Sequence, residues 1–509
     1  MWQSKYVYLI LIVLCFLIYA NSLNNAFVSD DITAILKYPL ISRLFSFWLD
    51  PSTFLSSLNY LIGKFNPFVY HLTNIILHSL NTILVFFFLR LFFKSEASFI
   101  GACLFTAHPI HTEAVTWISG RGYLTLSLFI LGTYLLYENA TGKSKGFKIS
   151  HYLLCLLLFS YFIIQHLSFY FLVPLFLILS DVTFGRWRKN WKWWIPFFII
   201  LILRLILARS LVSQRVLQVA KEIGSGVTWT NPIFNMVYSV FLSLGLILWP
   251  AKLTLYHEPA VISSFALKVG IATLLLLACA LPFIFKKAKE IFLAIIIFIL
   301  FLAPTYSPVM ISWLVAERYL YFPSIVFSII TSFAYDRYVI PMRNVSQKNL
   351  ILGFFVFFIA GYAVRTVARN EDWKSPERFW RQTVLVSYNS PRAHNNMGDI
   401  YSQEGNVEGA IKEFKRAIEL KPNYADVYHN LATTYYRKGD LKEAVKLYQQ
   451  ATSFNPELFE SHFNLCIIYL DTCELDLAIK EFQKATQIRP EDVNARQALE
   501  MAIKRKGAK

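Results

Sequence analysis

The chain has 509 residues, of which 56% are hydrophobic and only 16% are charged. Soluble domains carry about a quarter charged residues, so this composition excludes a soluble globule and indicates a membrane protein. Residues 1–370 hold 29 Lys and Arg against 12 Asp and Glu, whereas residues 371–509 hold 20 of each. The net charge of +17 therefore lies on the apolar part, which is the distribution expected when cytoplasmic loops collect Lys and Arg. The C-terminal part is neutral and so does not predict nucleic-acid binding.

Apolar stretches recur from Tyr6 to Val367 and predict an all-α, polytopic transmembrane helix bundle with about eleven spans. Because the first stretch lacks a small-residue cleavage site, we interpret it as a retained span and not as a signal peptide. The segment 233–250 disturbs the count. We expect a re-entrant or interfacial helix there; the alternative is that one of two short spans in 151–182 is not real. The predicted spans are 6–23, 70–93, 97–113, 122–138, 151–166, 168–182, 193–209, 265–285, 290–304, 319–335 and 349–367.

Four basic loops predict the orientation of the bundle, because Lys and Arg collect on the cytoplasmic side. They are Lys143–Lys148, Arg186–Lys192, Lys286–Lys289 and Arg337–Lys348. The N-terminus is then cytoplasmic. The loop 24–66 and the C-terminal domain lie on the non-cytoplasmic side, which is either the bacterial periplasm or the lumen of the endoplasmic reticulum. The apolar patches of this loop predict helices lying in the membrane interface.

Residues 391–492 consist of three aligned segments of 34 residues, 391–424, 425–458 and 459–492. Small residues recur in phase where helices would cross, and a proline recurs near the end of each segment, which is typical of stacked helix-turn-helix units. The pattern resembles the tetratricopeptide repeat, whose arrays bind peptides in a groove. The aligned residues are Ala410, Ala444 and Ala478; Ala417, Ala451 and Ala485; and Pro422, Pro456 and Pro490. The predicted domains are a transmembrane domain 1–370, a leading half-repeat 371–390, the three repeats, and a capping helix with a basic tail 493–509.

Two adjacent acids, Asp30 and Asp31, stand directly after the first span in NAFVSDDITAIL. Adjacent acids at a helix start commonly cap the helix, and capping is one reading of this pair. The other reading is chemical, because a carboxylate at the mouth of a membrane bundle can accept a proton. The closeness of the two acids would make them titrate as a pair.

Other polar residues are expected on the same side. AHPIHTEAV contains His108, His111 and Glu113, and SGRG contains Arg121. VAERYLYFPS contains Glu317 and Arg318, and LYHEP contains His257 and Glu258. Acids and arginines on one face suit a reaction with an anionic lipid, since an arginine would hold the phosphate. We interpret the histidines and glutamates as polar residues of a cavity.

A metal site is the weaker reading of this cluster. His108, His111 and Glu113 could ligate zinc, but Pro109 breaks the helix that would bring both rings together. The six cysteines contain no Cys-x-x-Cys pair, so neither a disulfide framework nor a zinc site is predicted.

The order FVSDD, HPIHTEAV, ISGR, AERYLYFPS and then the repeats resembles the transmembrane and tetratricopeptide-repeat-containing O-mannosyltransferases. These are membrane glycosyltransferases of the C-type fold, which use a sugar linked to polyprenyl phosphate. The resemblance covers nearly the whole chain. It implies transfer of a sugar, with mannose expected, to a Ser or Thr hydroxyl of a protein on the non-cytoplasmic side, with inversion at the sugar carbon. The repeats would present the acceptor polypeptide.

The resemblance also implies roles for individual residues. Asp30 would be the base for the acceptor hydroxyl, and Asp31 would support it or contact a divalent cation. Arg318 would hold the donor phosphate, with Arg121 and Arg209 as rivals.

The chain departs from its relatives near the fifth and sixth spans, where those relatives often carry Lys-Glu. Here Leu167 and Ser168 stand at that place. The loss of the lysine leaves open a different way of holding the donor, an altered donor, or an inactive protein.

Two alternatives follow from the sequence. The first is a non-catalytic, membrane-anchored scaffold whose repeats recruit a partner protein. The second is a transporter, which the clustering of charged residues at one surface, away from the midplane, disfavours.

Overall fold

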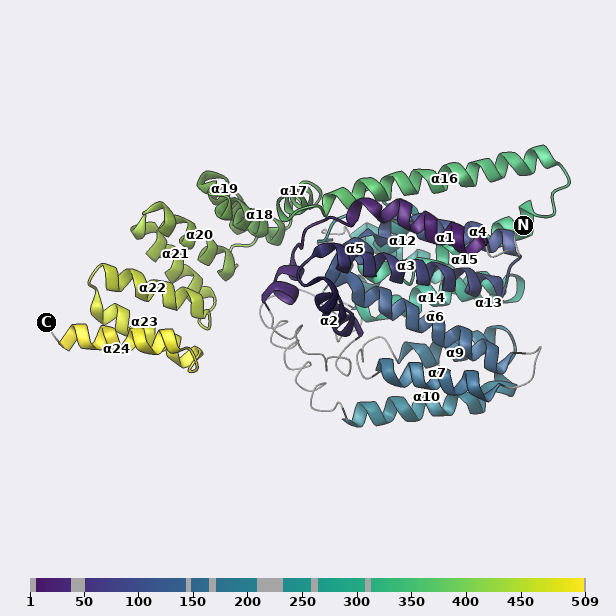
Figure 1. Cartoon of the computed structure of the whole chain (residues 1–509), viewed down its shortest axis with the longest axis horizontal. Coiled ribbons are helices and arrows are strands. Elements are labelled where there is room, and N and C mark those ends of the chain that lie inside the picture. Colours follow the sequence, from purple (N-terminus) through teal and green to yellow (C-terminus); the bar gives the residue numbers. More distant parts are fainter. Residues whose placement is uncertain are drawn as a thin grey trace. The chain divides into compact units, whose positions relative to one another are not determined.

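The computed structural model describes residues 6–37, 51–142, 148–163, 171–207, 232–257, 264–306 and 313–507. Regular structure in these ranges is helical throughout, which confirms the all-α prediction for the described part of the chain (Figure 1). Contacts divide the chain into two compact units, Met1–Ser375 and Pro376–Lys509. Each unit has an apolar core of its own.

The first unit is a bundle of α-helices and shorter helical turns. Its helices are α1 (Tyr6–Tyr19), α2 (Pro51–Gly63), α3 (Pro67–Arg90), α4 (Ser95–Ala107), α5 (Thr112–Thr116), α6 (Arg121–Thr141), α7 (Ile149–Ile163), α9 (Leu172–Thr183), α10 (Trp187–Leu207), α12 (Pro232–Leu248), α13 (Ser264–Lys287), α14 (Lys289–Tyr306), α15 (Ile325–Ala334) and α16 (Val345–Asp372). Shorter helical turns are η1 (Ala20–Ser22), η2 (Ile32–Lys37), η5 (Pro109–His111), η6 (Ile118–Gly120), η7 (Glu317–Leu320) and η8 (Tyr335–Val339).

Four of the described helices are long and apolar enough to cross a bilayer, namely α3, α10, α13 and α16. The helices on either side of Trp117 would form a fifth span if they are counted as one, although they meet at an angle of 101°. Several further apolar helices, including α1 and α4, have 10–17 residues. The large apolar side chains that α13 leaves exposed, such as Leu276, suit a hydrocarbon environment.

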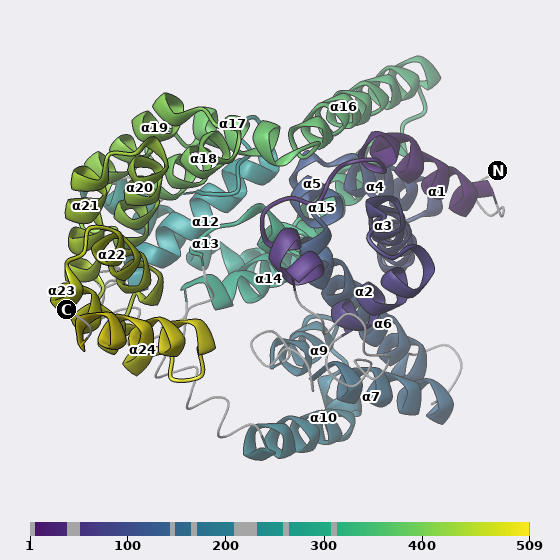
Figure 2. The ribbon, with the colours of Figure 1, turned by 60° about the vertical axis from the view of Figure 1, so that its left-hand side comes forward.

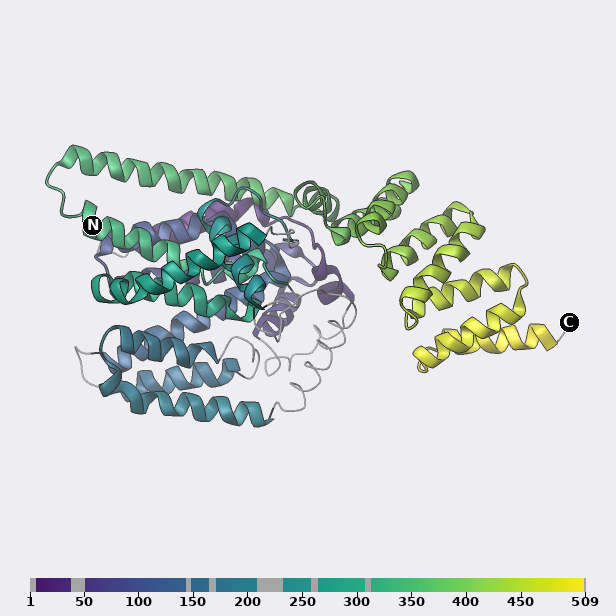
Figure 3. The same ribbon diagram turned by 180° about the vertical axis from the view of Figure 1, so that it is seen from behind.

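Helix α10 begins at Trp187, so most of the predicted basic loop Arg186–Lys192 is helical and the predicted span 193–209 starts six residues too late. Breaks in the helical path cause two further differences from the predicted spans. Helix α4 ends at Ala107, before the predicted limit of residue 113, because Pro109 ends the helical path and starts the turn η5. Helix α15 begins at Ile325, because the preceding residues 317–320 form the separate turn η7. The apolar segment that disturbed the predicted count forms α12, which packs against α13 and α14 (Figure 2 and Figure 3).

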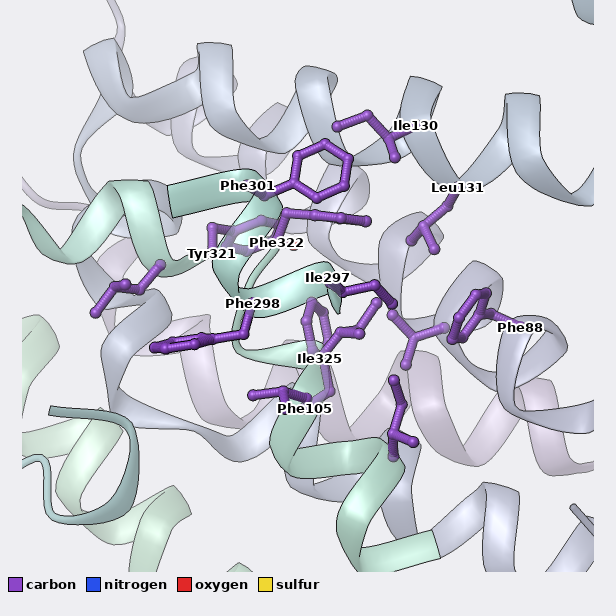
Figure 4. Packing of buried hydrophobic residues seen from close by; sticks show 14 of the residues in the cluster. Phe88, Phe105, Ile130, Leu131, Ile297, Phe298, Phe301, Tyr321, Phe322 and Ile325 are labelled. Atoms are coloured by element: carbon purple, nitrogen blue, oxygen red, sulfur yellow. The ribbon is translucent and has the colours of Figure 1, made fainter. Parts of the chain in front are cut away.

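The core of the first unit is built from apolar side chains on helices far apart in the sequence. Figure 4 shows Phe88 of α3, Phe105 of α4 and Ile130 of α6 close to Phe301 of α14 and Ile325 of α15. Because α3, α4, α6, α14 and α15 share this core, the segments at their ends are held in fixed relative positions.

A largely buried charge cluster joins α6, α9 and the start of α10. Arg186 forms an ion pair with Glu138, and its Nε atom lies 3.0 Å from Oδ1 of Asp181. The hydroxyl of Tyr137 donates to Asp181 at 2.6 Å. The first arginine of the basic segment 186–192 is therefore part of the packing between these helices, in addition to any role in orientation.

The second unit consists of α17 (Pro376–Val386), α18 (Pro391–Gln403), α19 (Val407–Leu420), α20 (Ala425–Lys438), α21 (Leu441–Phe454), α22 (Phe459–Asp471), α23 (Leu475–Ile488) and α24 (Val493–Gly507). Successive helices pack in antiparallel pairs (Figure 1). The six aligned alanines of the repeats are all fully buried, so the small residues do lie where neighbouring helices approach closely.

One side chain at the same position of each repeat fastens it to the preceding turn. His394 contacts the carbonyl oxygen of Tyr388 at 2.9 Å, and His462 contacts that of Pro456 at 3.1 Å. In the middle repeat the hydroxyl of Tyr428 donates to the carbonyl of Pro422 at 3.0 Å. These hydrogen bonds recur with the repeat and connect each helix pair to the chain before it.

Gly398 of α18 lies against the buried ring of Phe414. A Cβ atom at this position would be 2.7 Å from Cε1 of that ring. We predict that Gly398→Ala lowers the free energy of unfolding of a fragment 376–509 by about 1–3 kcal/mol in urea titrations, because overpacking outweighs the helix preference for alanine. Gly507→Ala, which meets nothing within 4 Å, is the control. Equal stability of Gly398→Ala and the wild-type fragment would contradict the packing described.

The same fragment should lose stability in acid through Glu481. Burial alone would raise the pKa of this carboxyl, but its hydrogen bond with His462 and the nearby Lys484 hold the pKa below its usual value. A depressed folded-state pKa contributes stability above the unfolded-state value and loses it as the pH falls. We expect urea midpoints at decreasing pH to fall more steeply for the wild-type fragment than for Glu481→Gln. Parallel curves would exclude this contribution.

Candidate functional site

The stretch from His108 to Arg121, called here the 108–121 turn, connects α4 to α6. It contains η5, α5 and η6, and all its residues are buried except the partly exposed Ser119. It contacts α3, α16 and η7, which come from distant parts of the sequence. The turn therefore brings polar residues from several distant segments together.

Glu113 and Arg318 form a buried ion pair. The Arg318 guanidinium donates from Nη1 to Oε1 of Glu113, and the Arg318 backbone N–H donates to Oε2 at 3.0 Å. Glu113 is fully buried and Arg318 is 8% exposed. Both oxygens of the carboxylate are thus used by one residue, which fixes η7 against α5.

Aromatic rings surround this arginine. The guanidinium carbon of Arg318 lies 5.3 Å from the ring centroid of Trp117 and 5.0 Å from that of Tyr319, distances at which a cation is attracted to a ring face. Trp117 in turn stacks on Trp373 at a centroid distance of 6.0 Å. A narrow cavity beside Arg318 is lined by Tyr123, Leu126, Phe301, Tyr319, Phe322 and Pro323.

The two acids of the first loop have different surroundings. The Asp31 carboxylate is fully buried and accepts three hydrogen bonds, from the N–H and hydroxyl of Ser119 at 2.8 and 2.5 Å and from the N–H of Val28 at 3.3 Å. Asp30 is exposed. Asp31 thus bonds both to the backbone of Val28, three residues before it, and to Ser119 of the 108–121 turn.

Burial raises the pKa of Asp31 to about 6, although the bonds from Ser119 and Val28 act in the opposite direction. Because this folded-state value exceeds the unfolded one, the group contributes most to stability below about pH 4 and loses that contribution as the pH rises through about 6. At neutral pH the three hydrogen-bond donors stabilise the ionised carboxylate in its buried position.

Arg121 is committed to groups of the protein. Its Nε donates to Asn74 Oδ1 at 2.7 Å, Nη1 donates to Ser56 Oγ at 3.2 Å, and Nη2 donates to the carbonyl of Tyr70 at 2.9 Å. The side chain is 1% exposed. It ties α6 to α2 and α3, so a phosphate would have to displace several of these bonds.

Glu317 belongs to a second, looser charge cluster. Its Oε1 lies 3.6 Å from Nη2 of Arg369 and 3.5 Å from Nε2 of His257. Glu317 is fully buried, and neither oxygen has a hydrogen-bond partner within the described ranges. Arg369 also pairs with Asp372 at 3.0 Å. Glu317 and Arg318 are adjacent in η7 but pair with different segments: Glu317 lies near Arg369 of α16, and Arg318 pairs with Glu113 of α5.

The two histidines of the 108–121 turn bond to separate partners. His108 accepts from the N–H of Ile110 at 3.2 Å and contacts the carbonyl of Ile247 at 2.8 Å, whereas His111 contacts the Ser324 hydroxyl at 2.7 Å. With both nitrogens of His108 engaged, this ring is not placed as a ligand. No group of three or more His, Cys, Asp or Glu that could hold a metal occurs among the described residues.

Four residues singled out in the sequence, Arg209, Glu258, Leu167 and Ser168, lie outside the described residues. Asn370, which the sequence reading passed over, is fully buried between the first loop and the 108–121 turn. It accepts from the Thr116 hydroxyl at 2.8 Å and donates to Asn21 at 2.9 Å. Its backbone carbonyl accepts from Asn25 at 3.0 Å.

Asn370 and Arg369 end a helix that the sequence reading treated only as a span. The signal that could have revealed them is charge. Two arginines, Arg365 and Arg369, stand at the end of α16 opposite the basic segment Arg337–Lys348, against the usual bias of charge across a membrane.

Comparison with known proteins confirms the resemblance indicated by the motifs. Human protein O-mannosyl-transferase TMTC3 is 26% identical over 476 residues, covering 80% of this chain and 50% of the human protein. Caenorhabditis elegans protein O-mannosyl-transferase F38B6.6 is 24% identical and covers 82% of this chain and 63% of its own length. The chain therefore spans about half to two thirds of the length of these relatives.

The repeat region matches a described family. The family model for the TPR repeat matches residues 398–439 and 433–472, which confirms the tetratricopeptide repeats. Among solved structures, the crystal structure of MamA protein aligns with 26% of this chain and 72% of its own length, at 23% identity and a TM-score of 0.24.

The Glu113–Arg318 pair generates a stability prediction. Removing one charge leaves the other buried and unpaired, so Glu113→Gln and Arg318→Gln should each destabilise the protein by about 3–5 kcal/mol. The double variant should lose clearly less than the sum of the two single variants, because no charge is then stranded. Thermal midpoints of the full chain in one detergent test this, and strictly additive shifts would show that the two side chains do not depend on each other.

Proposed function

We propose that the chain is a membrane glycosyltransferase that moves mannose from a polyprenyl-phosphate donor to a Ser or Thr hydroxyl of a polypeptide. The contact between Asp31 and Ser119 carries this proposal, because it joins the two most specific motifs, FVSDD and the 108–121 turn, into one site. Similarity to protein O-mannosyl-transferases over 80% of the chain supports the same chemistry.

In the proposed reaction the acceptor hydroxyl oxygen attacks the anomeric carbon of the mannose. Asp30 takes the hydroxyl proton, and the bond from the anomeric carbon to the phosphate oxygen breaks. A single displacement of this kind inverts the sugar carbon, and the polyprenyl phosphate leaves as an anion without needing a proton from a second carboxyl. Asp30 suits this role because it is exposed, whereas Asp31 is buried and holds the loop.

Arg318 is the donor-phosphate residue that the surroundings favour. It borders a cavity whose other walls are apolar and aromatic, which suits a phosphate followed by an isoprenoid chain. Arg121 is bonded to protein groups on all three nitrogens and is the weaker candidate. The cavity holds about 10 Å³, space for roughly one water molecule, so donor binding requires Tyr123 and Tyr319 to move.

We further propose the C-type architecture with about eleven spans, in which the shorter apolar helices also cross the bilayer. The N-terminus is then cytoplasmic, and the first loop, η7 and the repeats are non-cytoplasmic. The repeats present the acceptor polypeptide in their groove. A divalent cation near Asp31 is not required by this reaction, since three donors within the protein already serve that carboxylate.

The second candidate is a scaffold whose repeats recruit a partner and whose membrane part has no activity. The observation that favours it is the neutralisation of Arg318 by Glu113, which weakens the attraction of this site for an anion. The scaffold hypothesis predicts that the acids of the first loop are dispensable.

The test is transfer of labelled mannose to protein in membranes. We predict that Asp30→Asn lowers transfer at least about 100-fold while the thermal midpoint is unchanged, because the exposed carboxylate supports chemistry and not folding. Asp31→Asn should lower both, because an amide keeps only one acceptor oxygen; with that oxygen facing Ser119, its nitrogen faces the N–H of Val28. Glu290→Gln at the start of α14 is the control for the same chemical change. Full activity of Asp30→Asn would remove this residue as the base.

A further inference from the structure

An apolar groove lies between α1, α4 and α16, on helices of the first unit. Its cavity volume is about 580 Å³, within the range typical of ligand sites. The side chains lining it are all apolar and include Leu14 of α1, Ile100 and Cys103 of α4, and Phe355, Ile359 and Ala363 of α16. Since α16 is long and apolar enough to cross a bilayer, this groove faces hydrocarbon and not water.

The length of the groove matches one leaflet of a bilayer. On α16 it extends from Leu352 to Val364, which at 1.5 Å per residue corresponds to about 18 Å. The hydrocarbon core of a bilayer is about 30 Å thick, so one chain of one leaflet occupies about half of that distance. A single extended hydrocarbon chain therefore fits the groove lengthwise.

Positive charge stands at one end of the groove. Arg365 directly follows Val364 and donates to the carbonyl of Ala251 at 3.1 Å, next to the exposed Lys252. Within the described ranges, no carboxylate is close enough to form an ion pair with Arg365. The neighbouring Arg369, in contrast, is paired with Asp372. Asp372 and Glu317 also act electrostatically on Arg365, but both form their ion pairs with Arg369. Arg365, Arg369 and Lys252 together therefore carry one more charge than these two carboxylates, and this end of the groove keeps a net positive charge.

The groove is separate from the cavity beside Arg318. That cavity is lined by Leu126 of α6, Phe301 of α14 and residues of η7 and the following segment, and the two sets of lining residues have no member in common. The donor proposed above and an occupant of the groove would therefore contact different helices.

We propose that the groove between α1, α4 and α16 binds an acyl chain of an anionic phospholipid whose headgroup lies against Arg365. The acyl chain fills the space between α16 and the bundle, and the headgroup phosphate balances the net positive charge that remains at this end of α16. The lipid holds the end of α16 that carries Asn370 and hence the first loop. This inference does not depend on the transferase activity.

The test uses the full chain in nanodiscs of phosphatidylcholine containing a small fraction of phosphatidylglycerol with a photoactivatable diazirine on one acyl chain. After illumination, adducts are mapped by mass spectrometry. We expect adducts concentrated on the groove residues of α1, α4 and α16, and competition by unlabelled phosphatidylglycerol at least about fivefold stronger than by phosphatidylcholine. Arg365→Gln should abolish that preference while labelling of the groove continues.

Two matched variants of α16 isolate the groove from the rest of the lipid-facing surface. Ala360 lines the groove, whereas a side chain at the neighbouring Gly361 would meet nothing within 4 Å. Ala360→Phe should lower labelling of α1 and α4 at least about fivefold, and Gly361→Phe should leave it unchanged. Adducts spread evenly over all lipid-facing helices, or equal labelling of the two variants, would overturn the proposal. An unchanged headgroup preference in Arg365→Gln would overturn the role of that arginine.

Discussion

The arrangement of the site depends on the buried pair between Glu113 and Arg318. A charge in a low-dielectric interior must be matched by an opposite charge and hydrogen bonds, and here one arginine supplies both to a single carboxylate. The pair fixes η7 against α5. The stack of Trp117 on Trp373 and the bond from Thr116 to Asn370 then bring the end of α16 to the same turn.

The first loop is held by hydrogen bonds to the 108–121 turn and to the end of α16. Asp31 reaches Ser119 from one side, and Asn25 reaches the carbonyl of Asn370 from the other. The exposed Asp30 is thereby placed on a loop whose neighbours are buried and bonded. In the proposed mechanism the exposed Asp30 reacts, while the buried Asp31 holds the loop through its bond with Ser119.

Much of this could be predicted from the sequence, and for identifiable reasons. The repeats were indicated by the 34-residue period and by alanines at the same positions of each copy, since three such copies leave few alternative folds. Hydropathy indicated the apolar helices, but it placed the end of α4 at residue 113, because a hydropathy average does not register the break at Pro109. The motifs indicated which polar residues gather near the 108–121 turn.

Pairings across the fold could not be predicted. Nothing in the local sequence distinguishes Arg121, which is bonded to α2 and α3, from Arg318, which borders a cavity; only the fold assigns them different partners. Asn370 carries no motif, and its role arises because α16 ends beside the first loop. Similarly, the groove between α1, α4 and α16 exists only because three helices distant in sequence leave a space between them.

The measurement that tests the central claim most directly is whether the purified full chain, in liposomes, transfers mannose to an acceptor polypeptide. Two donors should be compared: polyprenyl-phosphate mannose and a nucleotide-activated mannose. We expect that mannose from the lipid donor alone appears on Ser or Thr, with inversion at the anomeric carbon. Transfer from the nucleotide sugar, retention of configuration, or no transfer to an acceptor that binds the repeats would contradict it.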